Sequence, residues 1–299
     1  MIKSCGNKQD IELDMSWHLT NWCNYDCNYC STLLSLTKNF TDDQHSKNYK
    51  LVLSRLKTIE VPWTMCLVGG EPSLNPYIEE IVEEMGKIPN LTVATLFTNF
   101  SRPASFYKTL MDLGNGKLFT LATYHPGFTK GQFVEKCIEL RKEEFEVFVN
   151  FTPDPSTWDE LDEMVKILND NGVITRPNIL HSTPWWKANY TKEFYDRFLH
   201  YFDSFEDIWE TTCNFEDGTS KIVRDYQFEI NEWNRFKGYK CTPLSYMIDV
   251  EGDIKNVCTR RKVPISLKNE NMVKQEICPN TICQGRKLIT YYKEKNETV

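Results

Sequence analysis

The sequence predicts an α/β fold: a partial, open barrel of six strand–helix units followed by a small cysteine-rich α+β extension. Strand-like and helix-like patterns alternate from about residue 13 to residue 206. Such alternation implies right-handed crossovers and a parallel sheet, and six units are too few to close an eight-fold barrel. Beyond residue 206 the alternation stops and four cysteines appear within a short span.

The six expected strands are short apolar or alternating runs that end in turn-forming or polar residues. They cover residues 13–19, 64–68, 91–97, 118–123, 145–151 and 173–180. The expected helices carry apolar residues at three- and four-residue spacing. They cover residues 43–59, a segment opened by Pro76, a segment from about Pro103, and residues 132–142, 158–169 and 191–205. Ligands bind at the carboxyl ends of strands in such sheets, so we expect the site there.

The predicted domain organisation has three parts. Residues 1–12 are expected to be an N-terminal tail, residues 13–206 the barrel, and residues 207–299 a connector with the cysteine-rich domain. Within that last part, residues 246–250 and 254–257 predict a hairpin around the turn Glu251-Gly252-Asp253.

Composition excludes some classes of protein and favours others. Hydrophobic residues make up 40% and charged residues 26%, which is typical of a globular protein with a sizeable core. The formal charge of −7 argues against a broad nucleic-acid interface. Neither a signal peptide nor an apolar run of membrane-spanning length is visible, so we expect a cytoplasmic protein. Eleven cysteines in such a chain indicate metal binding rather than disulfides.

The first chemical motif directly follows the first expected strand. Cys23, Cys27 and Cys30 have the spacing C-x3-C-x2-C. Three thiolates can hold three irons of a [4Fe–4S] cluster and leave the fourth iron open for a ligand. Zinc or redox-active thiols are the alternatives, but structural zinc needs a fourth ligand, and bacterial ferredoxins use a different cysteine order.

This loop, with Tyr29 just before its third cysteine, resembles the signature of the radical S-adenosylmethionine (SAM) enzymes. The turn Gly69-Gly70-Glu71-Pro72 after the second strand is similar to the GGEP motif of the same family. The resemblance covers roughly residues 13–205. It implies that Cys23, Cys27 and Cys30 ligate the cluster and that the glycine turn holds the amino group of SAM.

The resemblance also implies other cofactor contacts near the strand ends. Thr98, Asn99 and Thr123 are expected near the SAM carboxylate or ribose, and the sixth strand, with Ile174 and Ile179, near its adenine. The fifth strand lacks the family's glycine-containing adenine motif.

Two further features near the strand ends and in a later loop have competing interpretations. His125 is a candidate catalytic residue that faces the substrate, with an ordinary turn histidine as the alternative. Trp185-Trp186 is a candidate substrate loop or a packing element.

The mechanism implied by the resemblance is radical chemistry. SAM chelates the open iron, an electron from the reduced cluster breaks its S–C5′ bond, and the 5′-deoxyadenosyl radical abstracts a hydrogen atom from the substrate. The cofactor performs the difficult step and the protein orients the target. Such an oxidoreductase needs an electron donor, for example a flavodoxin or a ferredoxin.

The second cysteine set is Cys241, Cys258, Cys278 and Cys283. Four thiolates are enough to ligate a second [4Fe–4S] cluster completely, and they also make a structural zinc site. Their arrangement around a hairpin resembles the twitch domain, the shortened form of the SPASM extension of radical SAM enzymes, which favours an auxiliary cluster. Cys213 lies outside both sets; it is a candidate hydrogen-atom donor or a small buried hydrophobic residue.

The substrate stays open between two classes. Radical SAM enzymes with such extensions often modify peptides or proteins, including ribosomally made precursors, by oxidation, cross-linking or epimerisation. The alternative is a dehydrogenase, epimerase or mutase acting on a sugar, aminocyclitol or nucleotide. Little chain precedes the first strand, which weakens the peptide interpretation unless a partner protein supplies the recognition domain. A rival of another class is a non-catalytic iron–sulfur or zinc protein that binds a partner.

Overall fold

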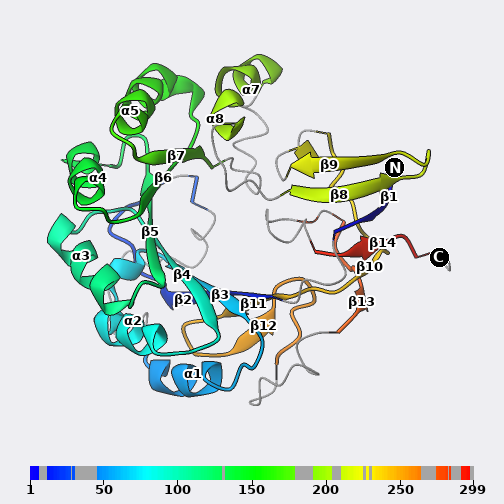
Figure 1. Ribbon diagram of the computed structural model, residues 1–299, viewed down its shortest axis with the longest axis horizontal. Helices are drawn as coiled ribbons and strands as arrows, with labels where there is room; N and C mark the ends of the chain where they lie inside the picture. The colour runs from blue at the N-terminus through cyan, green and yellow to red at the C-terminus, as the bar shows by residue number, and fades with distance from the viewer. Residues whose placement is uncertain are drawn as a thin grey trace.

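The computed structural model consists of two sheets, one of which is curved and covered by helices on its outer side (Figure 1). The residues it describes are 1–6, 12–27, 29–30, 46–129, 132–178, 191–203, 210–224, 227–228, 231–263, 274–281, 283 and 291–296.

The larger sheet has eight strands in the order β12-β11-β2-β3-β4-β5-β6-β7. From β11 to β7 every neighbouring pair is parallel, and β12 is antiparallel to β11. The strands are β2 (Leu13–Thr20), β3 (Trp63–Gly69), β4 (Leu91–Thr98), β5 (Leu118–Tyr124), β6 (Val147–Phe151), β7 (Ile174–Pro177), β11 (Ser245–Ile248) and β12 (Ile254–Asn256).

The alternation of apolar and polar residues determines which side chains of a strand face the helices and which face the inside of the curved sheet. In β2, Leu13, Met15 and Trp17 are completely buried, whereas the intervening Ser16 and His18 are half-buried. Successive side chains of a strand point to opposite faces, so the apolar set packs under the helices and the polar set faces inward. The inner face is therefore the more polar one at this strand.

The helices lie along the outer side of the curved sheet in chain order (Figure 1). In α2 the buried residues Ile78, Ile81, Val82 and Met85 follow the spacing of one helical face. The helices are α1 (Tyr49–Leu56), α2 (Ile78–Gly86), α3 (Ala104–Leu113), α4 (Phe133–Lys142), α5 (Trp158–Asp170), α7 (Lys192–Phe198) and α8 (His200–Asp203), with the 3₁₀ turns η2 (Pro72–Leu74) and η3 (Pro155–Thr157).

All six predicted strands and all six predicted helices of the barrel have counterparts here, so the partial-barrel prediction is confirmed. The largest differences are the following. Strand β6 begins at Val147 rather than at residue 145, and helix α1 begins at Tyr49 within the predicted segment 43–59. The strand expected to end at residue 180 ends at Pro177, and the last predicted helix is divided between α7 and α8. Residues 43–45, 179–180 and 204–205 of these predicted elements lie outside the described residues.

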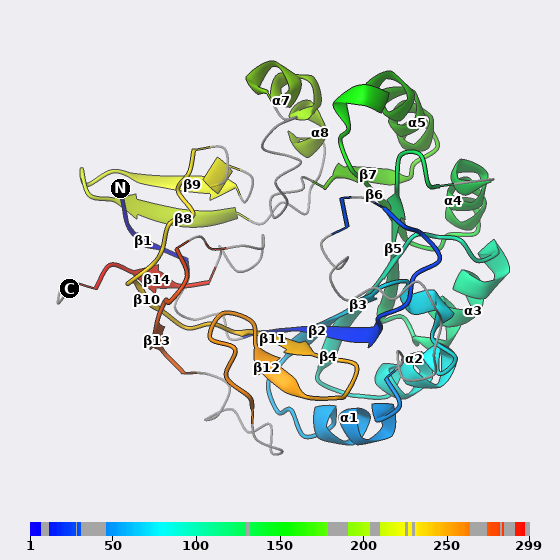
Figure 2. The ribbon, with the colours of Figure 1, turned by 180° about the vertical axis from the view of Figure 1, so that it is seen from behind.

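The smaller sheet gathers six short strands from both ends of the chain, in the order β13-β10-β14-β1-β8-β9. All its pairs are antiparallel. The strands are β1 (Ile2–Cys5), β8 (Glu210–Phe215), β9 (Ser220–Arg224), β10 (Lys240–Cys241), β13 (Glu276–Ile277) and β14 (Lys293–Glu294). Figure 2 shows both termini at this sheet, on the side away from α1–α5.

The prediction that residues 1–12 form a tail is wrong for Ile2–Cys5. These residues form β1, an inner strand of the smaller sheet, between β14 and β8. The hydroxyl of Tyr239 donates a hydrogen bond to the Ile2 carbonyl at 2.5 Å, deep in the protein. A four-residue strand carries too little pattern to be recognised alone, because its partners lie more than 200 positions away in the chain.

The predicted hairpin near residues 246–257 exists as β11 and β12, but it does not belong to the cysteine-rich sheet. Strand β11 pairs in parallel with β2 and extends the larger sheet at its first edge. The side chain of Asp14 accepts hydrogen bonds from Ser245 and Thr64 at 3.2 Å each, which links three adjacent strands. The chain therefore returns to the barrel after residue 206, contrary to the predicted boundary.

In the part of the chain that the structure describes, no helix has both the length and the apolar character needed to span a bilayer.

Candidate active site

The loop of Cys23, Cys27 and Cys30 begins directly after β2, at the carboxyl end of the parallel strands. Cys27 is buried, and Cys23 and Cys30 are half-buried. The loop is ordered locally: the Cys30 N–H donates to the Cys27 carbonyl at 3.1 Å, and the Tyr25 N–H donates to Cys23 Sγ at 3.4 Å. Three thiols are thus presented from one short turn at the place where ligands bind such sheets.

The glycine turn after β3 packs directly against the start of this loop. The Gly70 N–H donates to the Thr20 carbonyl and the Glu71 N–H to the Trp22 carbonyl, both at 2.8 Å. A Cβ atom on Gly70 would lie 2.0 Å from the Trp22 carbonyl oxygen, and Gly69 has a φ of +142°. Side chains are therefore excluded at both positions, and the two glycines fix the turn to the cysteine loop.

Glu71, predicted as a cofactor contact, uses its carboxylate inside the protein. One oxygen accepts from the Ser73 N–H at 3.0 Å and the Thr98 hydroxyl at 2.6 Å, and the other accepts from the Asn99 N–H at 2.6 Å. Complete burial raises the pKa of Glu71, and these hydrogen bonds oppose that effect. Glu71 and Thr98 therefore connect the glycine turn to the end of β4.

Asn99 reaches the cysteine loop, as its predicted role near the cofactor requires. Its amide nitrogen lies 2.7 Å from Asn24 Oδ1 and 3.8 Å from Cys23 Sγ, and its Oδ1 accepts from the Ser101 N–H at 3.1 Å. Asn24 was not singled out from the sequence, because an asparagine in a polar loop carries no distinguishing pattern. Asn24 connects the cysteine loop to the end of β4.

Two aromatic rings of the cysteine loop contact two rings that follow β5; we call Tyr25, Tyr29, His125 and Phe128 the aromatic group. The Tyr29 hydroxyl lies 3.2 Å from His125 Nδ1, and the two rings are stacked with centroids 6.1 Å apart. Tyr25 meets the His125 ring edge-on at 5.9 Å. Burial lowers the pKa of His125 to about 4, so the ring is neutral near pH 7. His125, a predicted catalytic residue, thus contacts the cysteine loop.

The thiols of the loop are held in a weakly solvated environment. Burial raises the pKa of Cys23 to about 11 and that of Cys27 to about 12, and mutual repulsion between the thiolates acts in the same direction. A metal favours the thiolate form, because a coordinated thiol loses its proton. A soft sulfur donor set of this kind fits iron.

Thr123, also predicted near SAM, is half-buried at the end of β5 and lies opposite Asn150 in the neighbouring strand. Asn150 in turn lies opposite Arg176 of β7. This polar row follows from the strand register, which the sequence alone did not provide. Ile174, predicted near adenine, is 45% exposed. Ile179 and Trp185-Trp186 lie outside the described residues.

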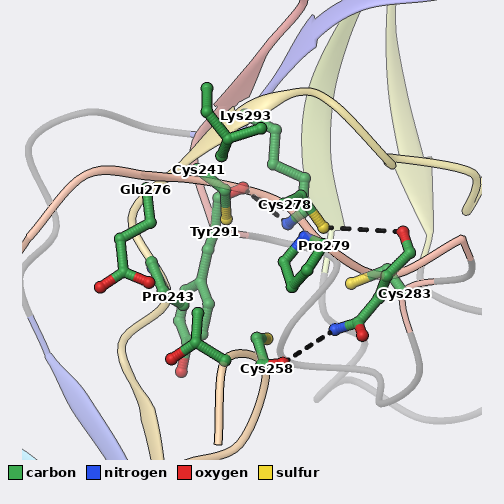
Figure 3. Close-up of a pocket in the computed structure, with 12 residues that line it drawn as sticks. Cys241, Pro243, Cys258, Glu276, Cys278, Pro279, Cys283, Tyr291 and Lys293 are labelled. Carbon is green, nitrogen blue, oxygen red and sulfur yellow. Dashed lines mark hydrogen bonds between the residues drawn. The ribbon is translucent and has the colours of Figure 1, made fainter. Parts of the chain in front are cut away.

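The second cysteine set surrounds one cavity in the smaller sheet (Figure 3). Cys241, Cys258, Cys278 and Cys283 all line it, although they come from distant parts of the sequence. The space not filled by atoms is about 440 Å³ and is partly open to solvent. The sequence-based expectation that these four cysteines act together therefore has a geometric counterpart.

Two other side chains lining this cavity, Tyr291 and Lys293, were missed by sequence reasoning. The buried hydroxyl of Tyr291 has no hydrogen-bond partner among the described residues. Burial raises the pKa of Cys241 to about 11 and that of Cys283 to about 12, and the positive charge of Lys293 opposes this in both cases. A hydroxyl without a hydrogen-bond partner in the described part of the chain and four thiols around one cavity are suitable for binding an iron–sulfur cluster.

Within the described ranges, no three histidine, cysteine or carboxylate side chains converge as closely as the ligands of one metal ion would.

Cys213, the candidate hydrogen-atom donor, is fully buried in β8 and lies opposite Cys5 of β1. A hydrogen bond between the Cys213 and Cys5 thiols raises the pKa of Cys213. These contacts belong to the smaller sheet, so the donor role stays a prediction.

Comparison with known families shows what the first part of the barrel resembles. Residues 17–131 match the model of the radical SAM superfamily, a segment that contains the cysteine loop, the glycine turn and the aromatic group. This segment is similar to a radical SAM domain. Radical SAM enzymes use a [4Fe–4S] cluster together with SAM, and the matched segment contains the three cysteines of the loop.

Solved structures extend the likeness beyond this segment. The structure titled "Native anSMEcpe with bound AdoMet" shares 14% identity over 87% of this chain and 82% of its own, with a TM-score of 0.57. A second structure of that enzyme, with bound AdoMet and Cp18Cys peptide, gives 15% identity, coverages of 88% and 82%, and a TM-score of 0.55.

Streptococcus suis SuiB bound to its precursor peptide SuiA gives 12% identity and a TM-score of 0.57, over 86% of this chain and 63% of SuiB. The chain thus spans less than two thirds of the length of SuiB. At these identities the likeness concerns the fold, which is that of radical SAM enzymes. Among curated proteins, none matches the chain.

Proposed function

We propose that this radical SAM enzyme modifies a peptide or protein, and that it holds an auxiliary [4Fe–4S] cluster on Cys241, Cys258, Cys278 and Cys283. The observation that carries the proposal is the extent of the structural likeness. It covers 88% of the chain, well beyond the barrel, and the similar structure is an enzyme with bound AdoMet and a peptide. The four cysteines around one cavity support the second cluster.

When bound, the first cluster and SAM together supply an electron and a 5′-deoxyadenosyl radical for hydrogen-atom abstraction. Cys23, Cys27 and Cys30 would hold that cluster. The contribution of the chain is to present these thiols, to bind SAM beside them and to orient the substrate.

The glycine turn serves the binding of SAM. Gly69 and Gly70 keep its backbone against the cysteine loop, where no Cβ atom fits. Glu71 holds the turn to the end of β4 through Thr98 and the Asn99 N–H. We infer that Glu71 and Thr98 act as positioning residues, whereas Asn99 and Thr123 reach the cofactor itself.

The aromatic group serves to exclude water. Tyr29 is only 5% exposed, and it stacks with a neutral His125 beside Cys27 and Cys30. A radical generated at this loop needs a dry surrounding, because water-filled space lets competing reactions occur. His125 is thereby given a role in shielding and positioning the loop.

The auxiliary cluster would occupy the cavity of the smaller sheet. Four thiols can ligate all four irons, and the Tyr291 hydroxyl is available as a donor to sulfur. Such a fully ligated cluster can transfer an electron to or from a substrate radical. The alternative is a zinc ion at the same four cysteines, and metal analysis distinguishes zinc from iron.

The proposal is tested with anaerobically reconstituted enzyme, a flavodoxin or ferredoxin as electron donor, and deuterated substrates. The expected result is transfer of deuterium from a peptide, such as one encoded beside the gene, into 5′-deoxyadenosine. Cys27→Ala is the control, which should abolish transfer. Transfer from a sugar, an aminocyclitol or a nucleotide, with none from peptides, would overturn the substrate class. An intact chain that carries metal but does not bind SAM would indicate a non-catalytic iron–sulfur or zinc protein.

A further inference from the structure

The smaller sheet aligns four buried side chains in one row across four neighbouring strands. Cys241 of β10 lies opposite Lys293 of β14, Lys293 lies opposite Cys5 of β1, and Cys5 lies opposite Cys213 of β8. Residues paired in this way project from the same face of a sheet, and neighbouring strands are about 4.8 Å apart. A lysine therefore stands between a proposed cluster ligand and a pair of thiols.

Lys293 is unusual for a lysine because it is only 1% exposed. Its ammonium group donates to the Tyr291 carbonyl at 3.0 Å and lies 5.2 Å from the centre of the Phe236 ring. Lysines are almost never fully buried unless their charge is compensated. A buried cation at this place therefore indicates negative charge nearby.

The cysteines around this lysine supply negative charge as thiolates when a cluster is bound. Lys293 lies opposite Cys241 and Cys5 in the sheet. It also lines the cavity together with the four cysteines of the second set, and Figure 3 shows the end of its side chain among them.

We propose that Lys293 is a positioning residue for the auxiliary cluster, whose ammonium group offsets the charge of the cluster thiolates and makes the reduction potential of the cluster less negative. The inference rests on the proposed second cluster. Net charge, hydrogen bonds to sulfur and solvent exposure set the potentials of iron–sulfur clusters. Reduction adds one electron to a group that is already negative, so a fixed cation in a dry site favours the reduced form.

The test is a redox titration of the full-length reconstituted chain, followed by electron paramagnetic resonance in a Cys27→Ala background that leaves only the auxiliary cluster. Lys293→Met is the variant because methionine keeps much of the length and loses the charge. Lys295→Met, two residues further on, is the matched control, since Lys295 is 46% exposed and pairs with Glu216 on the surface. We expect a more negative midpoint potential for Lys293→Met and none of this shift for Lys295→Met.

Equal potentials in the two variants would overturn the inference while leaving the second cluster intact. Such a result would mean that the ammonium group of Lys293 interacts with Cys5 and not with the cluster. A wild-type chain with about four irons instead of about eight would overturn the second cluster itself, and this inference with it.

A measurement on the wild-type chain covers the case in which Lys293→Met does not fold. Protein labelled with ¹⁵N-lysine is reduced, and electron–nuclear double resonance is recorded on the auxiliary cluster. Coupling to a lysine nitrogen supports the placement of Lys293, and its absence contradicts it.

Discussion

The two cysteine groups of this chain are built in opposite ways. Cys23, Cys27 and Cys30 come from one eight-residue loop at the edge of a parallel sheet. Cys241, Cys258, Cys278 and Cys283 come from separate segments. Cys241 lies in β10 and Cys278 directly follows β13 of the antiparallel sheet, which also includes β1, whereas Cys258 follows β12 at the edge of the larger sheet. The first group is defined by local spacing, and the second depends on long-range strand pairing. Loss of the smaller sheet should therefore remove the second group and leave the first.

Loss of a local ligand is expected to have the largest effect. Cys27→Ala should abolish reductive SAM cleavage, because two thiolates cannot hold the first cluster in place. Iron should fall from about eight to about four per chain, since each cluster holds four irons. Cys137→Ala is the control: this cysteine is also buried, but it lies in α4, away from both groups. Unchanged SAM cleavage in Cys27→Ala would contradict the assignment of the loop.

Removal of residues 1–6 should produce the reverse pattern. Without β1, the strands β14 and β8 lose their shared partner, so the auxiliary cluster should be lost while SAM cleavage persists. Iron should again fall to about four per chain. Ser4→Ala keeps the backbone of β1 and serves as the control. Equal losses from both groups would show that the two regions are not independent.

Gly70→Ala tests the contact between the glycine turn and the cysteine loop. The new Cβ would meet the Trp22 carbonyl oxygen at 2.0 Å, so one of the two segments must move. We expect SAM binding at least about tenfold weaker, the equivalent of about 1.4 kcal/mol. Gly116→Ala is matched in chemistry but has no atom within 4 Å of its Cβ, and it should cost about 1–2 kcal/mol of stability for its positive φ without affecting SAM binding. Calorimetry with SAM measures the difference.

Glu71→Gln should have the smallest effect, on stability rather than chemistry. An amide NH₂ replaces one of the two oxygens that accept from Ser73, Thr98 and the Asn99 N–H, so a buried donor loses its acceptor. This should cost about 1–3 kcal/mol in urea unfolding. Glu83→Gln, in an exposed pair with Lys87, should cost no more than about 0.5 kcal/mol. Equal costs would mean that the Glu71 network contributes nothing specific.

The contrast between the two regions also explains how far the sequence could be interpreted. The barrel strands, the cysteine loop and the glycine turn are encoded by short-range patterns, and they were predicted within a few residues. Strand β1, the attachment of β11 to β2 and the row through Lys293 depend on partners more than 200 positions away, or on strand register. Local periodicity does not contain that information. The engagement of Glu71 by Thr98 likewise follows from tertiary contact rather than from the GGEP motif.

The most direct measurement of the central claim is the iron and sulfide content of the anaerobically reconstituted wild-type chain, with Mössbauer spectroscopy and a reductive SAM cleavage assay on the same sample. Two independent [4Fe–4S] clusters predict about eight irons and eight sulfides per chain, together with formation of 5′-deoxyadenosine. About four irons with one zinc, or no cleavage of SAM at any iron content, would contradict the account.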